Sequence, residues 1–487
     1  MAFGTARQLL DRGAAAAAGT EAERRARHEA ARGDVVRQLR ALPPDAQVRL
    51  AKRTSNLFRP RLATAAPGLD VSRLDSVIAV DRVARTADVQ GMTTYEDLVD
   101  ATLAHGLMPL VVPQLKTITL GGAVTGLGIE STSFRNGLPH ESVRELEVLT
   151  GSGDVVVARP EGPHAELFRA FPNSYGSLGY ALRLVIDLEP VRPYVRLSHV
   201  RFTDLAALTE AVGQVMTSSE FDGRPVDFLD GTVFSAAEAY LTLGAWSDTA
   251  TATSDYTGQQ IYYRSIRTRD TDVLSVRDYL WRWDTDWFWC SRAFGAQNPR
   301  VRRLWPKAWL RSDVYWRLVR LENRFGVAAR IERWRGRPDR ERVVQDVEIP
   351  LGRTAEFLTW FLREVPIEPV WLCPIRLRST GATARFAEEH GGTPWPLYPL
   401  RPGSDYVNIG FWSTVPVVDG ATDGDVNRRI EGVVSEHDGH KSLYSDSYYD
   451  EARFWSLYGG VDYRAAKDRY DPGSRLLDLY AKAVRRR

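Results

Sequence analysis

Residues 117–137 read Thr-Ile-Thr-Leu-Gly-Gly-Ala-Val-Thr-Gly-Leu-Gly-Ile-Glu-Ser-Thr-Ser-Phe-Arg-Asn-Gly, and this glycine-rich stretch decides which fold to expect. Its glycines at 121, 122, 126 and 128 let a backbone approach a ligand closely and expose several N–H groups to it. The hydroxyl groups at 131–133 add further donors. Such a nest of donors suits a pyrophosphate or an extended dinucleotide. A tight structural loop that packs on a sheet is the alternative interpretation.

The spacing of these glycines excludes two common phosphate-binding motifs. It does not match G-x-G-x-x-G, and no strand–helix unit of the expected kind precedes it, so a Rossmann fold is not favoured. It also lacks the Gly-Lys-Ser/Thr of a P-loop. The stretch therefore belongs to a different kind of fold.

Short strands and helices flank the glycine-rich stretch. Residues 93–104 predict a helix in which Thr93 and Glu96 form a capping box and Gly106 follows the end. Strands are predicted at 77–80, 87–89, 143–149, 154–158, 182–188 and 406–412, and a turn at 151–153 makes a hairpin of the third and fourth. Strands and helices in this order predict an α+β fold.

The composition is that of a globular protein with more than one domain, because 487 residues are too many for one compact core. The net charge of +2 gives no reason to expect nucleic acid as a partner. Cys290 and Cys373 can neither build a disulfide framework nor hold zinc, so no metal site is expected. The arginine- and alanine-rich composition suggests a bacterial source. Without a signal-peptide pattern or a membrane-spanning window, we expect a cytoplasmic protein.

Two stretches resemble the FAD-binding fold of the vanillyl-alcohol-oxidase type, the PCMH-type domain. Gly-Gly-x-x-x-Gly-x-Gly at 121–128, with Ser-x-Ser and Gly137 after it, resembles the flavin loop, and Tyr-Gly-Ser-Leu-Gly-Tyr at 175–180 resembles the second signature. Residues 53–58 stand where the family has its first phosphate-binding loop, without the usual glycines. The resemblance implies cofactor contacts from Arg53, Thr54, Ser55, Thr119, Gly121, Gly122, Thr125, Gly126, Gly128, Ile129, Glu130, Ser131, Ser133, Gly137, Gly176, Gly179 and Tyr180.

The mode of FAD binding follows from what the first loop lacks. Oxidases of this fold often tether FAD through His or Cys, and residues 51–62 contain neither. We therefore expect FAD to be held non-covalently.

Within this fold the chain is most similar to the 24-dehydrocholesterol reductase (seladin/diminuto) group. The matching stretches lie at 125–133, 343–350, 370–375 and 443–448. The resemblance implies an FAD-dependent oxidoreductase that reduces an isolated carbon–carbon double bond in a lipid, with NADPH recharging the flavin. Because most bacteria lack sterols, a methylene-branched fatty acyl chain fits as well as a sterol or isoprenoid side chain. A lipid methyltransferase that makes such a chain would then be a partner.

The resemblance also divides the chain into four segments. We expect a helical segment at 1–42, the FAD-binding domain at 43–195, a separate α+β substrate (cap) domain at 196–430, and a segment at 431–487 that returns to the flavin.

The implied reaction needs a proton donor, because an isolated alkene has no carbonyl to stabilise a carbanion and protonation before hydride transfer is the easier order. One positioned acid in a dry, aromatic wall would suffice. Tyr444, Asp446 and Tyr448 would share one face of a predicted strand at 442–449, and Lys441, just before it, is a further candidate catalytic residue. We favour Asp446 or Tyr444 as the donor, and an ordinary polar face is the alternative.

A second group of candidates lies on two earlier strands. Asp346 and Glu348 are two residues apart on a predicted strand at 343–349, hence on one face, and Glu348 is the next candidate donor. Two solvent-facing acids are the alternative. Trp371 and Cys373 are expected in the pocket wall.

Residues 300–342 carry an unusual charge. Thirteen arginines and Lys307 outnumber five acids there, a net charge of +9, and Trp305, Trp309, Trp316 and Trp334 lie among them. Arginine mixed with tryptophan fits the headgroup layer of an anionic membrane, so we expect peripheral contact at the inner face. A salt-bridged surface is the alternative, and no nucleic-acid-binding module accompanies the charge.

Two other functions remain open from the residues. An alcohol or sugar oxidase or epimerase on the same fold would need a base and several polar pocket residues. A non-enzymatic flavin-fold scaffold would not need the glycine-rich stretch, which is present in full.

Overall fold

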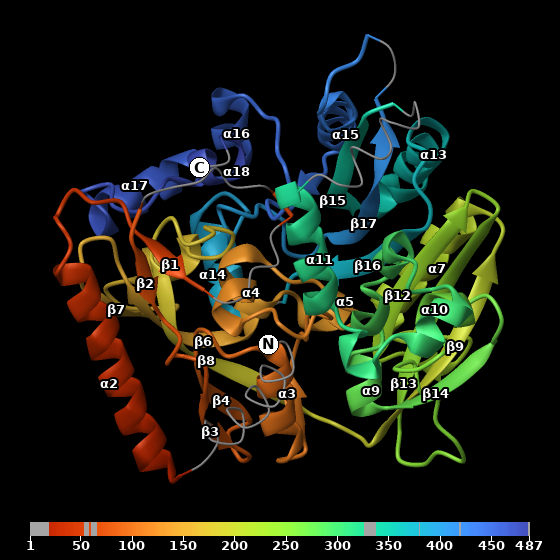
Figure 1. The fold of residues 1–487 in the computed structure, drawn as a ribbon, viewed down its shortest axis with the longest axis horizontal. Coiled ribbons are helices and arrows are strands. Elements are labelled where there is room, and N and C mark those ends of the chain that lie inside the picture. The colour runs from red at the N-terminus through yellow and green to blue at the C-terminus, as the bar shows by residue number, and fades with distance from the viewer. Residues whose placement is uncertain are drawn as a thin grey trace.

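The computed structural model describes residues 19–52, 58–59, 66–325, 338–378, 380–417 and 420–485. Arg53, Thr54 and Ser55 lie outside the described residues. Two large sheets dominate the described chain, and Figure 1 shows one among the orange-to-yellow elements and the other among the yellow-to-blue ones. The predicted α+β class is confirmed. None of the helices described has both the length and the apolar character to cross a bilayer.

The first sheet is antiparallel throughout and has the order β3-β4-β8-β6-β7, with β5 also paired to β8. Side chains of β8 at Leu182, Leu184 and Ile186 are buried, alternating with more accessible ones, as expected of a strand that supports a core. The predicted strands and hairpin are confirmed. The strand bounds are Val77–Asp81 (β3), Thr86–Gln90 (β4), Leu107–Pro109 (β5), Val143–Leu149 (β6), Val155–Ala158 (β7) and Tyr180–Pro190 (β8).

The predicted helix after β4 exists but begins later and is capped differently. Helix α3 runs Tyr95–Leu103, and its cap is Thr94, whose hydroxyl group accepts the Asp97 N–H at 3.2 Å. Thr93 is fully buried instead, and its carbonyl group accepts the N–H of Leu120. The capping box expected from Thr93 and Glu96 is therefore wrong by one residue.

The glycine-rich stretch is partly helical, where a loop was expected. Helix α4 runs Leu120–Gly126, and the Thr119 hydroxyl group caps it by accepting the Gly122 N–H at 3.2 Å. The Gly121 N–H bonds the carbonyl oxygen of Gly91, and a Cβ at 121 would lie 2.6 Å from that oxygen. These two backbones touch, so Gly121 is needed for protein packing as well as for any ligand.

The second sheet has eight antiparallel strands in the order β14-β9-β13-β12-β16-β17-β15-β18. The chain passes from the first sheet to this one between Pro190 and Tyr194. The predicted strands at 343–349 and 406–412 are confirmed within longer ones. The bounds are Tyr194–Phe202 (β9), Phe228–Ser235 (β12), Glu238–Ser247 (β13), Thr271–Ser275 (β14), Arg340–Pro350 (β15), Val370–Arg376 (β16), Asp405–Pro416 (β17) and His440–Lys441 (β18).

The two faces of the second sheet are covered by different material. Helices α7 (Leu205–Ser218), α13 (Thr354–Glu364) and α15 (Asp425–Glu436) pack on one face around a largely aliphatic core. The opposite face contacts an aromatic segment, 256–296, that forms one continuous core with the first sheet. That segment and its continuation hold α8 (Tyr262–Ser265), α9 (Val276–Leu280), η2 (Asp284–Asp286), η3 (Cys290–Phe294), α10 (Pro299–Leu304), η4 (Lys307–Trp309) and α11 (Ser312–Phe325).

The C-terminal segment joins the second sheet for only two residues and then returns to the first. His440 and Lys441 pair with β15, the Ser442 N–H bonds the carbonyl oxygen of Asp346, and the chain then leaves the strand. The strand expected at 442–449 is therefore wrong. Helices α16 (Glu451–Leu457), α17 (Gly460–Tyr470) and α18 (Leu479–Ala483) follow, and α17 packs on α6 (Ala165–Ala170) of the first unit.

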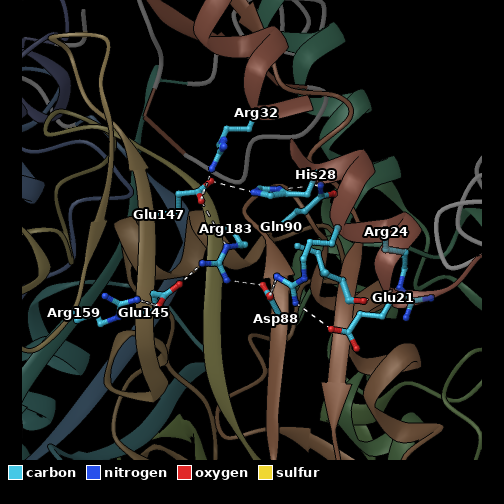
Figure 2. A network of polar contacts seen from close by, with 12 residues as sticks. Glu21, Arg24, His28, Arg32, Asp88, Gln90, Glu145, Glu147, Arg159 and Arg183 are labelled. Atoms are coloured by element: carbon cyan, nitrogen blue, oxygen red, sulfur yellow. Dashed lines mark hydrogen bonds and ion pairs between the residues drawn. The ribbon is translucent and has the colours of Figure 1, made fainter. Parts of the chain in front are cut away.

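The N-terminal helix α2 (Glu21–Arg40) is docked on the first sheet by buried polar groups (Figure 2). His28, which is 1% exposed, lies 3.1 Å from a carboxylate oxygen of Glu147 on β6 and 3.3 Å from the Gln90 amide on β4. Arg183 of β8 pairs with Asp88 in the same network. The remaining small elements are β1 (Arg49–Ala51), β2 (Gly68–Asp70), α5 (Ser133–Asn136), η1 (Pro139–Ser142), β10 (Glu220–Phe221), β11 (Arg224–Pro225), η5 (Leu351–Arg353) and α14 (Gly381–Glu389).

Candidate active site

An elongated cavity of about 440 Å³ lies between the two sheets. Residues of β1, the glycine-rich stretch and 175–181 line one part of it, and aromatic residues of 287–290 and of the second sheet line the other. The two glycine-containing stretches meet there because the Tyr175 hydroxyl group donates to the Gly126 carbonyl oxygen at 2.6 Å. Ligand pockets are commonly 300–1,000 Å³, so the size suits an extended ligand.

Most of the residues that the resemblance assigned to the cofactor lie along this cavity. A cation lies beside the glycine-rich part of the lining. The Lys52 ammonium group donates to the Thr119 hydroxyl group at 3.2 Å, and both residues line the cavity. Lys482, from α18, donates to the carbonyl oxygens of Tyr175 and Gly176 and fixes that turn. The expected residues found in the lining are Thr119, Gly121, Gly122, Thr125, Gly126, Gly128, Ile129, Gly176, Gly179 and Tyr180.

Four other expected cofactor residues lie away from the cavity, because the chain turns into the interior after Ile129. Glu130 is 3.4 Å from the Arg282 guanidinium group, and the Ser131 hydroxyl group lies 2.8 Å from that of Tyr279. Ser133 accepts the Glu130 N–H at 3.1 Å. Gly137 ends α5 with φ of 68°. Glu130 and Ser131 tie the glycine-rich stretch to the aromatic segment, and Ser133 bonds within the stretch itself.

The lining of the cavity fits FAD. A dinucleotide needs polar and cationic groups for its phosphates, and the end with Lys52 and Thr119 supplies them. A flavin ring needs flat, apolar surroundings, and Trp287, Phe288 and Trp412 supply them at the other end. Glycines along the middle leave the backbone accessible.

Among the described residues, Asp346 of β15 is the one carboxylic acid that lines the cavity, and it lies at the aromatic end. Room for it comes from Gly410 on the paired strand β17, because a Cβ at 410 would collide with the Asp346 carboxyl group. The Trp412 N–H donates to the Tyr444 hydroxyl group at 2.9 Å, and that hydroxyl group bonds the Asp346 carboxyl group. Burial raises the pKa of Asp346 to about 7, although the bonds from Asn408 and Tyr444 oppose the increase. Asp346 can therefore carry a proton near neutral pH.

Aromatic rings surround this acid. The ring of Phe288 lies 4.4 Å from that of Trp412 and 5.3 Å from that of Trp371, centroid to centroid. Cys290 is in the same wall, and burial raises the pKa of its thiol to about 12, so the thiol stays protonated. Trp371 lines the cavity as expected, whereas Cys373 is fully buried and is absent from the lining.

Three of the four expected catalytic residues do not line the cavity. Asp446 pairs with Arg342 at 3.1 Å. Lys441 is fully buried and its ammonium group bonds Glu431 at 2.7 Å. Glu348 is fully buried and accepts the Ser442 hydroxyl group at 3.0 Å. Asp446 and Glu348 thus join the C-terminal segment to β15, Lys441 joins it to α15, and of the four only Tyr444 lines the cavity.

The sequence indicates Asp346 and Glu348 together but favours Glu348 of the two as a donor. The alternation along the strand placed Asp346 on the same face as Glu348, which is confirmed, yet only Asp346 lines the cavity. The signal that could have separated them is Gly410, since a glycine opposite an acid on a paired strand makes room for a carboxyl group. That pairing is a tertiary contact and cannot be predicted from one sequence alone.

Known proteins resemble the chain both locally and along most of its length. An FAD-binding domain family model matches residues 21–159, a region that begins with helix α2. Delta(24)-sterol reductase of Arabidopsis thaliana is 24% identical over 444 residues, which cover 86% of this chain and 77% of that protein. The Delta(24)-sterol reductase of Homo sapiens is 25% identical over 85% of this chain and 77% of its own length. Cytokinin dehydrogenase 9 of Oryza sativa is 32% identical over 30% of this chain and 27% of its own. Residues 21–159 therefore match an FAD-binding domain, and most of the chain is similar to Delta(24)-sterol reductases.

Proposed function

We propose that this protein is an FAD-dependent reductase that adds hydrogen across an isolated carbon–carbon double bond of a lipid. The observation that carries the proposal is Asp346, one acid with a pKa of about 7 at the aromatic end of the cavity. The sterol reductases to which the chain is related support the same class of substrate.

The division of labour between cofactor and protein follows from the lining. FAD, held non-covalently and recharged by NADPH, would supply the hydride. Asp346 gives its proton to one alkene carbon, and the Tyr444 hydroxyl group keeps the carboxyl group oriented. The faces of Trp287 and Phe288 favour the positive charge that protonation creates and exclude water that would capture it. The carboxyl group then regains its proton from solvent.

The substrate class is a branched, unpolarised alkene. Both a methylene-branched fatty acyl chain and a sterol or isoprenoid side chain present a double bond whose protonation gives a tertiary cation. An acyl substrate of this kind would be supplied by a lipid methyltransferase, which we propose as a functional partner.

Anaerobic titration of the purified protein with NADPH tests the proposal. The protein should be yellow, acid should release free FAD, and NADPH should bleach the flavin. A methylene-branched acyl lipid or a sterol with a side-chain alkene should then restore the colour. Bleaching by alcohols or sugars without any response to NADPH would establish the oxidase alternative, and colourless protein would leave only a scaffold role.

A further inference from the structure

Exposed apolar side chains gather on one short part of the surface. Among the described residues, large apolar side chains with high exposure are Val83, Val301, Leu304, Trp309 and Val461. Three of these five fall within nine residues, on α10 and η4, with Leu304 85% exposed. Isolated apolar residues on a surface are ordinary, but a cluster marks a place of contact.

Basic side chains surround this cluster, and Asp255, which interacts electrostatically with Lys307, lies near one of them. Arg300, Arg303 and Lys307 are exposed, and none of them pairs with a carboxylate of the described residues. The sequence from 287 to 312 contains no Asp or Glu. On α10, Arg300, Arg303 and Leu304 stand three and four positions apart and so share one face. We call residues 300, 301, 303, 304, 307 and 309 the basic–apolar patch.

The patch is held firmly on both sides. Arg302 is 2% exposed, and its guanidinium group makes two bonds to Asp286, at 2.6 and 2.9 Å. After the patch, Arg311 makes two bonds to Glu96, at 3.1 and 2.7 Å. The apolar side chains are therefore presented outward by a fixed backbone. Arg302 and Arg311 are therefore neutralised by acids, whereas Arg300, Arg303 and Lys307 form no ion pair with the described residues.

The patch lies on the outer side of the aromatic wall of the cavity. Trp305, between its members, packs on Tyr315 of α11 with ring centroids 6.4 Å apart. Tyr315 stacks on Trp287 at 6.5 Å, and Trp287 lines the cavity. These ring contacts therefore lead from the patch to the cavity wall.

We propose that the basic–apolar patch docks the protein on an anionic lipid bilayer, with Leu304 and Trp309 entering the interface and the three cations facing lipid phosphates. Charge complementarity selects this occupant, because basic side chains favour an anionic surface and Leu and Trp favour its apolar boundary. The proposal does not depend on the reductase activity, since binding to vesicles needs no turnover.

Co-sedimentation with vesicles of phosphatidylglycerol and phosphatidylcholine tests the docking. The protein should bind these vesicles at low salt, bind pure phosphatidylcholine at least about 10-fold more weakly, and be released by salt. Leu304→Asp should weaken binding to the anionic vesicles at least about 10-fold, because it removes an apolar contact and adds a repelled charge. Val461→Asp is the matched control: it makes the same kind of change at a side chain 76% exposed on α17 and should leave binding unchanged.

Flavin absorbance confirms that each variant is folded. Equal binding by wild type and Leu304→Asp, or no binding to anionic vesicles at low salt, would overturn the proposal. Retention of the protein by heparin without binding to vesicles would also overturn it and would assign the patch to a polyanion. Loss of NADPH oxidation with vesicle binding intact would refute the proposed function and leave the docking surface standing.

Discussion

At the scale of single residues, the proton donor depends on which of two neighbouring acids reaches the cavity. Asp346 and Glu348 lie on the same face of the same strand. Gly410 leaves space beside Asp346, whereas Glu348 is covered by Ser442, whose hydroxyl group donates to it. The chemistry of the site is therefore decided by the cross-strand neighbour.

Replacing the donor gives the most direct test. Asp346→Asn keeps the shape but holds no transferable proton, so reoxidation of the reduced flavin by a lipid alkene should slow by about 10²–10⁴-fold. Bleaching by NADPH should survive, because that half-reaction needs no such acid. Asp446→Asn is the matched control, since its carboxylate pairs with Arg342 away from the cavity lining, and it should reoxidise at nearly the wild-type rate. The opposite result, a slow Asp446→Asn and a normal Asp346→Asn, would contradict the assignment.

The raised pKa of Asp346 also predicts how stability changes with pH. The carboxyl group has a pKa of about 7 when folded and an ordinary value of 3.8, so between these values the folded state binds more protons. Stability should therefore fall as pH rises from 3.8 to about 7. Asp346→Asn cannot ionise and should gain stability relative to wild type at pH 8, with the difference vanishing below pH 3.8. Urea unfolding at both pH values measures it, and a constant difference would refute the raised pKa.

At the scale of elements, the glycine-rich stretch is held by backbone contacts as well as shaped for a ligand. Its first half is a capped helix against Gly91, and its second half is anchored by Glu130 and Ser131. Packing within the protein therefore explains several of these glycines without any ligand. Replacing them tests folding before it tests flavin binding.

A pair of glycine variants separates the effect of backbone packing on stability from the effect of helix propensity. Gly121→Ala should lower the yield of folded, flavin-containing protein, because the new Cβ would lie 2.6 Å from the carbonyl oxygen of Gly91. Gly432→Ala, in helix α15 with nothing within 4 Å of its Cβ position, should instead stabilise the protein by about 0.5–1 kcal/mol. Thermal unfolding and flavin content measure both. A Gly121→Ala protein as stable as wild type would show that the two backbones can separate.

At the scale of the whole molecule, a buried ion triad joins the glycine-rich stretch to the second sheet. Arg282 is fully buried, 2.9 Å from Asp230 of β12 and 3.4 Å from Glu130, and its guanidinium group lies over the Tyr279 ring at 4.0 Å. The indole groups of Trp283 and Trp371 donate to the same Asp230 oxygen. The triad therefore fixes the two sides of the cavity relative to each other.

Removing the cation should loosen this junction. Arg282→Met leaves two buried carboxylates without a cation to balance their charge and should destabilise the protein by about 3–5 kcal/mol. Burial already raises the pKa of Glu130, and the loss of Arg282 would raise it further, so the defect should be greater at pH 8 than at pH 5. Arg277→Met, which breaks an exposed pair with Asp100, should cost about 1 kcal/mol or less. Equal losses in the two variants, measured by urea unfolding, would argue against a structural role for the triad.

The sequence by itself determined most strands of the first sheet, because strand alternation is a local pattern. Its resemblance to known proteins identified the FAD-binding domain and ten residues that line the cavity. The sequence also placed Asp346 and Glu348 on one face. The cap of α3, the end of the late strand after Lys441 and the inward turn after Ile129 were decided by the tertiary structure. Each depends on a partner distant in sequence, respectively Leu120, Asp346 and Arg282. The proton donor belongs to this second group, since a carboxyl group acquires a pKa of about 7 only from the burial and neighbours that folding brings to it.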